Sequence, residues 1–333
     1  MNKISLCMIV KNEASHIGNC LKSVKNLVDE MIIIDTGSTD QTIEICEQYG
    51  ATIYQYEWDD DFSAARNFGL QLCQKEWILW LDADETIDPQ ALEKIPACIQ
   101  TTEAQIIQLP IMNYFGKSQQ LNQEDYHLLY QPRLFKNQLG IYFTGRIHES
   151  LDISTHDYKQ TVLPTPVYHF GYTDEQMESK QKSQRNLAIL LDEIQANEDD
   201  PWIKYFIASE LNILKEYELA FQFLNQSIIN FIKLNIQPPS IIYKLRYDIL
   251  IRTENWQGAA ESIEKALLLY PDYVDLHYYH GIILYHLEKF PEAQLAFERC
   301  LELGNEHEKY FILHGVGSFR AEKYIQLCKE KNN

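Results

Sequence analysis

Long apolar runs are missing from this sequence of 333 residues. No stretch reaches the roughly 18 apolar residues that a membrane-spanning helix needs, so we expect no transmembrane segment. The first apolar run, Ile4 to Val10, ends at Lys11 and is too short for a secretory signal peptide. These features predict a cytoplasmic protein.

Paired cysteines are missing as well. The seven cysteines are widely spaced and include no C-x-x-C pair. An odd number at such spacing is typical of reduced thiols in a cytoplasmic protein. We expect most of these cysteines to be small buried apolar residues.

Basic residues are scarce relative to acidic ones. The chain has 29 Lys and Arg against 48 Asp and Glu, which gives a formal net charge of −19. This balance disfavours a broad binding surface for nucleic acid or for an anionic membrane, so we expect no nucleic-acid partner.

Two common phosphate-binding loops are absent. No G-x-G-x-x-G follows the first apolar run, and no G-x-x-x-x-G-K-[ST] occurs anywhere. A dinucleotide-binding fold and a P-loop enzyme are therefore disfavoured.

The most informative stretch that is present runs from Trp77 to Glu85 and reads WILWLDADE. Its five apolar residues predict a short strand buried on both faces, as in a parallel sheet. Ligands bind outside the carboxyl ends of such strands, and Asp82 and Asp84, one residue apart, suit Mg²⁺ or Mn²⁺. An ordinary polar strand end is the plainer interpretation of an isolated Asp-x-Asp.

Buried strands and helices alternate before this stretch. Strands are predicted at Ile4–Val10, Met31–Ile34 and Thr52–Tyr56, with helical patterns between them. This order predicts a doubly wound α/β sheet.

Polar residues follow three of these strands. In a parallel sheet the strand ends meet at one edge, where carboxylates can hold a base, a ribose and a metal. The residues concerned are Lys11 to Glu13, Asp35, and Asp82 to Asp84.

Four blocks in the first 85 residues resemble an inverting family 2 glycosyltransferase in order and spacing. The blocks are SLCMIVKNEASHIGNCLKSV, IIIDTGSTDQTIEI, FSAARNFGL and WILWLDADE. The resemblance implies a GT-A-like fold, a nucleotide-diphosphate sugar as donor, with a UDP-sugar such as UDP-glucose as the expected one, and Mg²⁺ or Mn²⁺ as cofactor.

The resemblance also implies roles for matching residues. Asp35 would lie on the nucleobase side and Asp82 near the ribose, while Asp84 would bind the metal that bridges the diphosphate. Arg66 would lie near the phosphates or brace the acidic site, unless it forms an ordinary surface salt bridge. The implied donor-binding residues are Val10, Asn12, Glu13, Asp35, Ser38, Arg66, Asp82 and Ala83.

The middle of the chain carries weaker secondary-structure signals. A helix is predicted at Gln90–Thr101 and a strand at Ala104–Pro110, whereas the polar and aromatic residues 113–130 predict a flexible loop for an acceptor.

Two later segments, RLFKNQLGIYFTGRIHESL and VYHFGYTDEQMESKQKSQRN, resemble a subgroup of the family in which helical repeats follow. On this basis Glu149 is the candidate catalytic base, oriented by His148, with Arg66 as the third catalytic candidate. His169 would join Asp84 and Asp82 as a metal ligand, or would be a structural histidine. Arg133, Lys180 and Arg185 are candidate phosphate contacts, although the last two also suit a solvated helix face.

From Pro201 onwards the sequence repeats. The last two copies are offset by 34 residues, the period of tetratricopeptide repeats, and residues 307–329 are expected to form a capping helix. Five tyrosines could line a groove or lie in the core: Tyr205, Tyr243, Tyr247, Tyr278 and Tyr279. The equivalent positions are Ala220, Ala259 and Ala293; Leu224, Ile263 and Phe297; and Ser227, Ala266 and Cys300.

These features predict a catalytic domain at 1–175, a connecting helix at 176–198 and a tetratricopeptide-like helical repeat domain at 199–333. The layout is similar to that of bacterial glycocin peptide S-glycosyltransferases, which implies transfer to Cys or Ser of a bacteriocin-like polypeptide. Transfer to a cell-envelope polysaccharide or lipooligosaccharide is one alternative, and a non-catalytic repeat scaffold with a degenerate transferase fold is another. The repeats would bind the polypeptide acceptor or form a homodimer.

Overall fold

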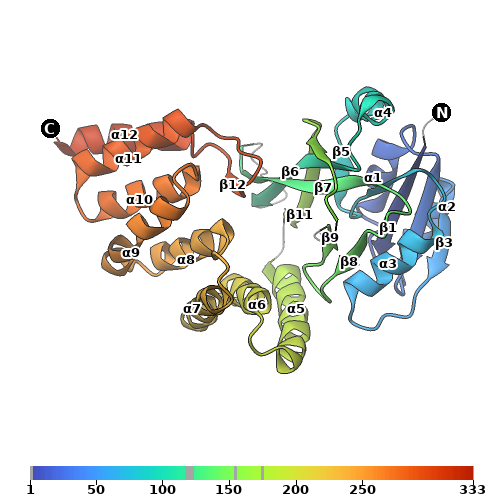
Figure 1. Cartoon of the computed structure of the whole chain (residues 1–333), viewed down its shortest axis with the longest axis horizontal. Coiled ribbons are helices and arrows are strands. Elements are labelled where there is room, and N and C mark those ends of the chain that lie inside the picture. The colour runs from blue at the N-terminus through green and yellow to red at the C-terminus, as the bar shows by residue number, and fades with distance from the viewer. Residues whose placement is uncertain (1–2, 117–123, 154–155, 174–175, 333) are drawn as a thin grey trace. The chain divides into compact units, whose positions relative to one another are not determined.

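In a computed structural model of the chain, residues 3–116, 124–153, 156–173 and 176–332 are described. The chain divides into two compact units, Met1–Leu121 with Leu129–Asp174, and Asn122–Leu128 with Glu175–Asn333. The first unit holds a mixed sheet with helices, and the second is mainly helical (Figure 1). The predicted fold class is confirmed, and the separate connecting helix at 176–198 stays a proposal.

Four parallel strands form one half of the sheet, and each predicted strand of this half is present. The main strand order of the ten-stranded sheet is β3-β2-β1-β4-β7-β6-β11-β5, with β10 paired to β6 and β12 paired to β7. In this half β1 pairs with both β2 and β4, and β2 pairs with β3. The bounds are β1 (Ile4–Val10), β2 (Glu30–Asp35), β3 (Thr52–Gln55) and β4 (Trp77–Trp80).

Strands β1, β2 and β4 are buried on both faces because helices cover each side, whereas β3 lies at the edge of the sheet and is partly exposed. Along β1, Leu6 and Met8 pack with helices α1, α2 and α4, whereas Cys7 packs on the opposite face with α3. This alternation produces the continuous apolar runs from which a doubly wound sheet was predicted. The helices are α1 (Ile17–Val24), α2 (Thr42–Gln48), α3 (Phe62–Leu72) and α4 (Ala91–Thr101).

The other half of the sheet is mixed, which the sequence did not indicate. Strand β7 runs antiparallel to β4, and β11 pairs parallel with β6 and antiparallel with β5. The prediction of a loop over 113–130 was wrong for 113–116 and 126–130, because cross-strand pairing extends both β6 and β7; residues 117–123 lie outside the described part. The bounds are β5 (Glu85–Ile87), β6 (Ile106–Gly116), β7 (Tyr126–Lys136), β8 (Tyr142–Thr144), β9 (Ser150–Asp152), β10 (Gln160–Val162) and β11 (Val167–Thr173).

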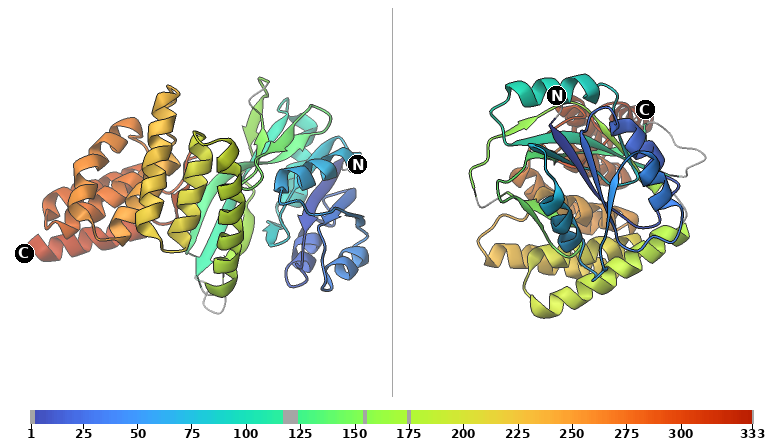
Figure 2. Two further views of the ribbon diagram at one scale, coloured as in Figure 1. Left: turned by 90° about the horizontal axis from the view of Figure 1, so that it is seen from below. Right: turned by 90° about the vertical axis from the view of Figure 1, so that its right-hand side faces the viewer.

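The second unit is a stack of helix pairs, visible from yellow-green to red in the left view of Figure 2. Helices α6 with α7, α8 with α9, and α10 with α11 form the three predicted repeats, after α5 and before α12. The bounds are α5 (Gln176–Ala196), α6 (Pro201–Ile213), α7 (Tyr217–Lys233), α8 (Ser240–Arg252), α9 (Trp256–Leu269), α10 (Val274–His286), α11 (Phe290–Leu303) and α12 (Phe319–Asn332).

The repeat register predicted from the sequence is confirmed. All nine equivalent positions are fully buried, and the turn inside each helix pair has a residue with positive φ: Lys215, Glu254 and Glu288. At Gly281 a Cβ atom would lie 2.6 Å from the ring of Phe297, so glycine allows α10 to pack closely on α11.

The predicted capping helix over 307–329 begins later, at Phe319. Gly315 adopts φ +87°, and a Cβ atom there would lie 2.3 Å from the ring of Phe319. A left-handed glycine of this kind ends any helix that approaches it. The preceding residues instead form an extended segment with the short strand β12 (Ile312–Leu313), which pairs with His127 and Leu128.

This extended segment is bound by α8 and α10 within the second unit. Lys244 Nζ donates to the carbonyl of Phe311 at 3.0 Å, and Tyr273 Oη donates to the same oxygen at 2.7 Å. Asp275 contacts Lys244 and accepts the N–H of Leu313 at 3.1 Å. The chain thus occupies this helical surface with its own backbone.

The tyrosines proposed for a peptide groove lie mostly in the core of the second unit. Tyr205, Tyr247, Tyr278 and Tyr279 are buried, and Tyr243 is partly buried. The plainer interpretation of these residues as core is therefore correct for four of the five.

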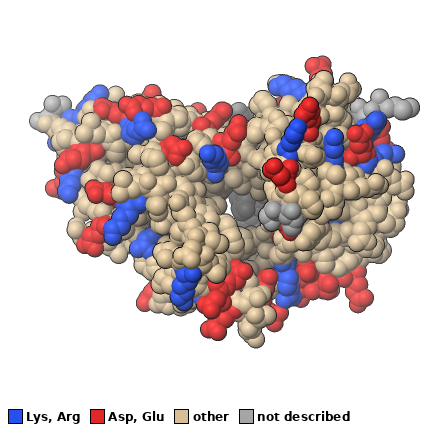
Figure 3. Space-filling view, viewed as in Figure 1, with Lys and Arg blue, Asp and Glu red and all other residues tan. Residues whose placement is uncertain are grey.

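Charged side chains of both signs are mixed on part of the surface (Figure 3). On the face shown in Figure 3, the described Lys and Arg side chains lie between Asp and Glu side chains. Among the described residues, none of the helices combines the length and the apolar character needed to cross a bilayer.

Candidate active site

The loops that follow β1 and β2 are bound to each other at the edge of the sheet. The N–H of Asn12 donates to Ser38 Oγ at 2.9 Å, and the Asn12 side chain accepts the N–H of Thr39 at 2.7 Å. The N–H of Glu13 donates to Thr42 Oγ1 at 2.7 Å. The structure therefore brings together Asn12, Glu13 and Ser38, which the sequence placed in one donor site.

Asp35 is buried at the end of β2, opposite Val10 of β1. Its carboxylate accepts the N–H groups of Gly37 at 3.1 Å and of Ser38 at 3.1 to 3.2 Å. A carboxylate bonded in this way fixes the turn that follows it. Asp35 therefore shapes the backbone next to Asn12.

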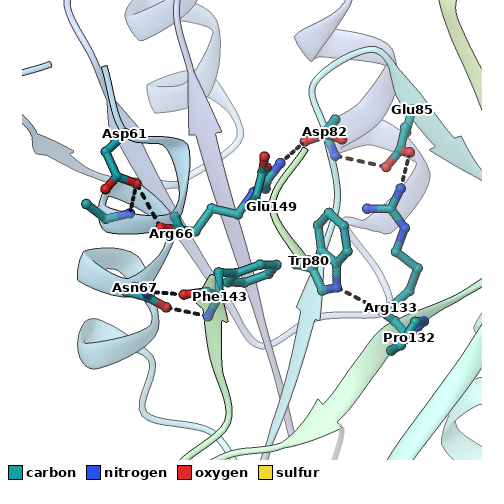
Figure 4. Close-up of polar contacts among 12 residues, drawn as sticks. Asp61, Arg66, Asn67, Trp80, Asp82, Glu85, Pro132, Arg133, Phe143 and Glu149 are labelled. Atoms are coloured by element: carbon teal, nitrogen blue, oxygen red, sulfur yellow. Dashed lines mark hydrogen bonds and ion pairs between the residues drawn. The ribbon is translucent and has the colours of Figure 1, made fainter. Parts of the chain in front are cut away.

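Arg66 lies on α3 and bridges two carboxylates. Its Nη2 atom donates to Asp82 Oδ1 at 2.7 Å and its Nε atom to Glu149 Oε1 at 2.6 Å (Figure 4). The Arg66 side chain is only 7% exposed, so it is not an ordinary surface salt bridge. The structure thus joins Arg66, Asp82 and Glu149, which lie far apart in the sequence.

Local structure places Arg66 in this position. Asp61 accepts the N–H of Ala64 at 2.9 Å and caps the start of α3. The side chain of Asn67 both donates to the carbonyl of Phe143, at 2.8 Å, and accepts its N–H, at 2.7 Å. These two hydrogen bonds hold β8 against α3, close to the segment that carries Glu149.

The charge of the Asp82 carboxyl group is fixed by its neighbours. Burial alone would raise its pKa, but the positive charges of Arg66 and Arg133 hold the pKa of Asp82 well below its usual range. Asp82 is therefore an anion at neutral pH.

Asp84 and His169 form a second pair at the same strand end. His169 Nε2 lies 3.4 Å from Asp84 Oδ2, and His169 Nδ1 lies 2.8 Å from Asn113 Oδ1. Strand pairing supports this arrangement, because the N–H of Phe170 donates to the carbonyl of Asp84 at 3.2 Å. Burial lowers the pKa of His169, but the hydrogen bond with Asp84 and the negative charges of the surrounding carboxylates together raise that pKa above its ordinary value.

The chemistry of this pair fits a divalent cation. When Nδ1 donates to Asn113 and Nε2 is deprotonated, the neutral imidazole would present a lone pair on Nε2, the usual orientation of a metal-binding histidine. A carboxylate oxygen and an imidazole nitrogen are ligands for Mn²⁺, and Mg²⁺ favours carboxylates together with substrate phosphates.

The third predicted ligand, Asp82, is bound to Arg66. Within the described part of the chain, no group of three His, Cys, Asp or Glu side chains could hold a metal alone. Asp84 and His169 would therefore hold an ion together with oxygen atoms of a donor.

Two residues of the site carried no predicted role. Glu85 is buried, accepts the N–H of Asp82 at 2.9 Å through Oε2, and accepts Arg133 Nη2 at 2.5 Å through Oε1. Trp80 lies between the two arginines in Figure 4. The charged end of WILWLDADE could have suggested Glu85, but nothing in the sequence pairs it with Arg133.

The remaining candidates lie as follows. His148 is exposed with φ +52°, and Arg66 binds the Glu149 carboxylate. Ala83 is buried between the two aspartates. Arg185 donates to the side chain of Asn186 at 2.9 Å within the helical unit, and the side chain of Lys180 lies outside the described residues.

The profile of the family described as "Glycosyl transferase family 2" matches residues 5–174, about half of the chain. The chain belongs to glycosyl transferase family 2.

Two relatives of this family 2 member match about four fifths of its chain. A TPR repeat-containing protein of Synechococcus elongatus is 32% identical over 79% of this chain and 64% of its own length. The SPbeta prophage-derived glycosyltransferase SunS of Bacillus subtilis is 29% identical over 84% of this chain and 66% of its own length. The chain thus spans less than two thirds of both relatives. A crystal structure of S. aureus TarS 1-349 in complex with UDP-GlcNAc superposes with a TM-score of 0.43 at 18% identity, covering 79% of this chain and 92% of that one.

Proposed function

We propose that this protein is a metal-dependent inverting glycosyltransferase that moves a sugar from a UDP-sugar to a polypeptide, at Cys or Ser. The observation that carries the catalytic part is the neighbouring placement of the Asp84–His169 pair and the Arg66 bridge at the carboxyl end of β4. The Asp84–His169 pair offers metal ligands, and the Arg66 bridge offers a buried cation next to two carboxylates.

The proposed reaction forms a bond from the acceptor to the anomeric carbon while the bond to the diphosphate breaks. Mg²⁺ or Mn²⁺ would neutralise charge on the leaving diphosphate. Arg66 adds a fixed positive charge near the leaving group, in a buried site where such a charge acts strongly. Glu149 binds Arg66 through Oε1, which leaves Oε2 to accept the acceptor proton, in keeping with the proposed role as base.

Glu149→Gln should lower transfer to a serine hydroxyl by about 10²-fold, the lower end of what a general base contributes. Glutamine preserves the shape and an acceptor for Arg66, so donor binding should not change. For a cysteine acceptor the loss should be smaller, because a few per cent of the thiol is already ionised near pH 7. Initial rates on matched Ser and Cys peptides measure both effects, and normal turnover on the serine peptide would exclude Glu149 as base.

The acceptor assignment is supported by the resemblance to glycocin peptide S-glycosyltransferases and by the repeats. Because Phe311 and Leu313 already occupy part of α8 and α10, an acceptor peptide would contact other parts of the repeats. The test is mass spectrometry after incubation with UDP-sugars, Mn²⁺ and either Cys- and Ser-containing peptides or cell-envelope glycan fragments. Sugar found only on the glycan would contradict the polypeptide acceptor and would favour the alternative, a cell-envelope glycan.

A homodimer through the repeats is the second part of the proposal about partners. The apolar tip of α7 is defined as Ile229 and Ile232, near the end of the helix, with Leu234 and Ile236, which directly follow it. Each of these residues is more than half exposed, at 52%, 58%, 56% and 51%. Clustered exposed apolar side chains commonly mark a protein contact.

Ile229→Lys with Ile232→Lys should therefore convert a dimer into monomers in sedimentation velocity. The melting temperature of the helical unit should change little, since both side chains already face solvent. Leu268→Lys on α9, 82% exposed, is the matched control and should leave the assembly state unchanged. A wild-type monomer would contradict the proposal.

The proposed location is the cytoplasm. All seven cysteines are free, and six of them are buried, which supports a reducing compartment.

A further inference from the structure

The turn from Asp82 to Asp84 is held by buried side chains beside it. Among them is Arg133, the candidate phosphate contact from the sequence, whose guanidinium group donates to Glu85. We propose that Glu85, Arg133 and Trp80 are positioning residues, which fix this turn in the shape that binds the donor diphosphate and its metal. The inference rests on the proposed function, because it concerns how that site is held.

Glu85 is the direct link to the turn. Its side chain is 1% exposed, and its Oε2 atom accepts the N–H of Asp82 at 2.9 Å. A hydrogen bond to a carboxylate in a buried setting is strong and directional. Glu85 therefore fixes the backbone at Asp82, one residue before Ala83 and two before Asp84.

Arg133 fixes Glu85 in turn. Strand β7 pairs with β4 so that Leu134 lies opposite Leu79, which puts Arg133 beside the end of β4. Its Nη2 atom donates to Glu85 Oε1 at 2.5 Å. Arg133 lies on β7, which pairs with β4, and Glu85 begins β5, which pairs with β11. The ion pair therefore joins two strands of the sheet that are not neighbours, and it holds Glu85 in the way that a precise site needs.

Trp80 joins this network to the Arg66 bridge. The guanidinium carbon of Arg133 lies 3.7 Å from the ring centre of Trp80, and that of Arg66 lies 4.7 Å from it. The indole N–H donates to the carbonyl of Pro132 at 2.7 Å and fixes the ring (Figure 4). One ring thus orients both arginines.

Burying the Glu85–Arg133 ion pair costs more free energy than an apolar pair at the same place would. Within the described residues, Arg133 Nε and Nη1 are buried without a hydrogen-bond partner, and the side chains of Arg133 and Glu85 are both almost fully buried. Apolar residues of similar size often replace a buried ion pair without loss of stability. The charged pair is therefore better explained by the placement of Asp82 and Asp84.

Two double variants separate positioning from packing. Glu85→Gln with Arg133→Met removes both charges but keeps an oxygen that accepts the N–H of Asp82. Glu85→Met with Arg133→Met also removes both charges and keeps the volume, but lacks that oxygen. The two proteins therefore differ by the one hydrogen bond in question.

We expect the variant with Gln to exceed the variant with Met by about tenfold in affinity for UDP with Mn²⁺ and in kcat/KM for the donor, the value of one buried hydrogen bond. Calorimetry measures the first quantity and initial rates the second. Hydrogen exchange of the peptide that contains Asp82 should be faster in the Met variant, with melting temperatures close to each other. Glu103→Gln with Lys159→Met removes an exposed ion pair and should change none of these quantities.

Equal exchange at Asp82 and equal donor affinity in the two folded double variants would overturn the positioning role. Hydrogen exchange needs no donor or metal, so it distinguishes this failure from failure of the proposed function. If exchange differs as expected but wild type binds no UDP with Mn²⁺, the network holds the turn and the assigned ligand is wrong, which also overturns the proposal as stated.

Discussion

Asp84→Ala should lower the rate of sugar transfer by about 10²–10³-fold, the usual loss when one preorganised stabiliser of the leaving-group charge is removed. The variant should fold normally, because the side chain of Asp84 lies at the end of a strand whose core residues stay in place. Rates at saturating UDP-sugar, with Mn²⁺ varied, measure the loss.

If Asp84 binds the metal, the Mn²⁺ requirement of this variant should also change. Asp84→Ala should need more Mn²⁺ for half-maximal rate, and His169→Ala should show the same change, since both side chains lie at 3.4 Å from each other. Glu93→Ala removes an exposed carboxylate from α4 and serves as the control. Full activity of Asp84→Ala, or of wild type in excess chelator, would exclude the metal.

The parallel half of the sheet could be predicted because its signals are local. Strands β1, β2 and β4 are short apolar runs that are buried on both faces, and each is followed by a polar turn. The sequence alone therefore predicts that the loops at Asn12, Asp35 and Asp82 lie at one edge of the sheet. Strand order then follows from the alternation with helices.

The antiparallel half could not be predicted in the same way. Tyr114 and Phe115 lie in a polar and aromatic stretch that suggests a loop, yet they belong to β6 because β11 pairs along it. Pairing between distant segments leaves no period in a single segment. For the same reason, the contact between Asp84 and His169 was implied only by family resemblance.

The repeats show the same contrast within one unit. Positions such as Ala259 and Ala293 follow from a 34-residue period, and the structure places both in the core. The binding of Phe311 and Leu313 by Lys244 and Asp275 depends on pairing across the unit, which no period encodes.

The division of the chain also affects how the repeats can be tested. Asp125 is bound by Arg320 at 2.5 Å, and Tyr126 accepts the N–H of His314 at 2.9 Å, all within the second unit. A truncation near residue 197 would remove these partners and expose the start of β7. Point variants on the apolar tip of α7 are therefore the cleaner test.

Arg66→Met should lower the free energy of unfolding by about 3–5 kcal/mol, the usual cost of leaving a buried charge without its partner. The variant leaves the carboxylates of Asp82 and Glu149 near each other without the cation that both now bind. Transfer should also be lost, because no fixed positive charge would remain next to the diphosphate. Denaturant titration and initial rates measure the two effects separately.

Arg66→Lys should recover only part of both losses, because an ammonium group is a point charge and lacks the planar fork that now binds Asp82 through Nη2 and Glu149 through Nε. Arg66→Met combined with Glu149→Gln should recover stability, since one unpaired carboxylate is gone, but it should not recover transfer. Arg252→Met breaks an exposed pair with Asp248 and should cost less than about 1 kcal/mol. A loss at Arg66 no larger than the loss at Arg252 would mean that the buried bridge contributes nothing to stability. Recovery of transfer by the Arg66→Met, Glu149→Gln protein would remove Arg66 from the reaction and leave it as a counter-ion alone.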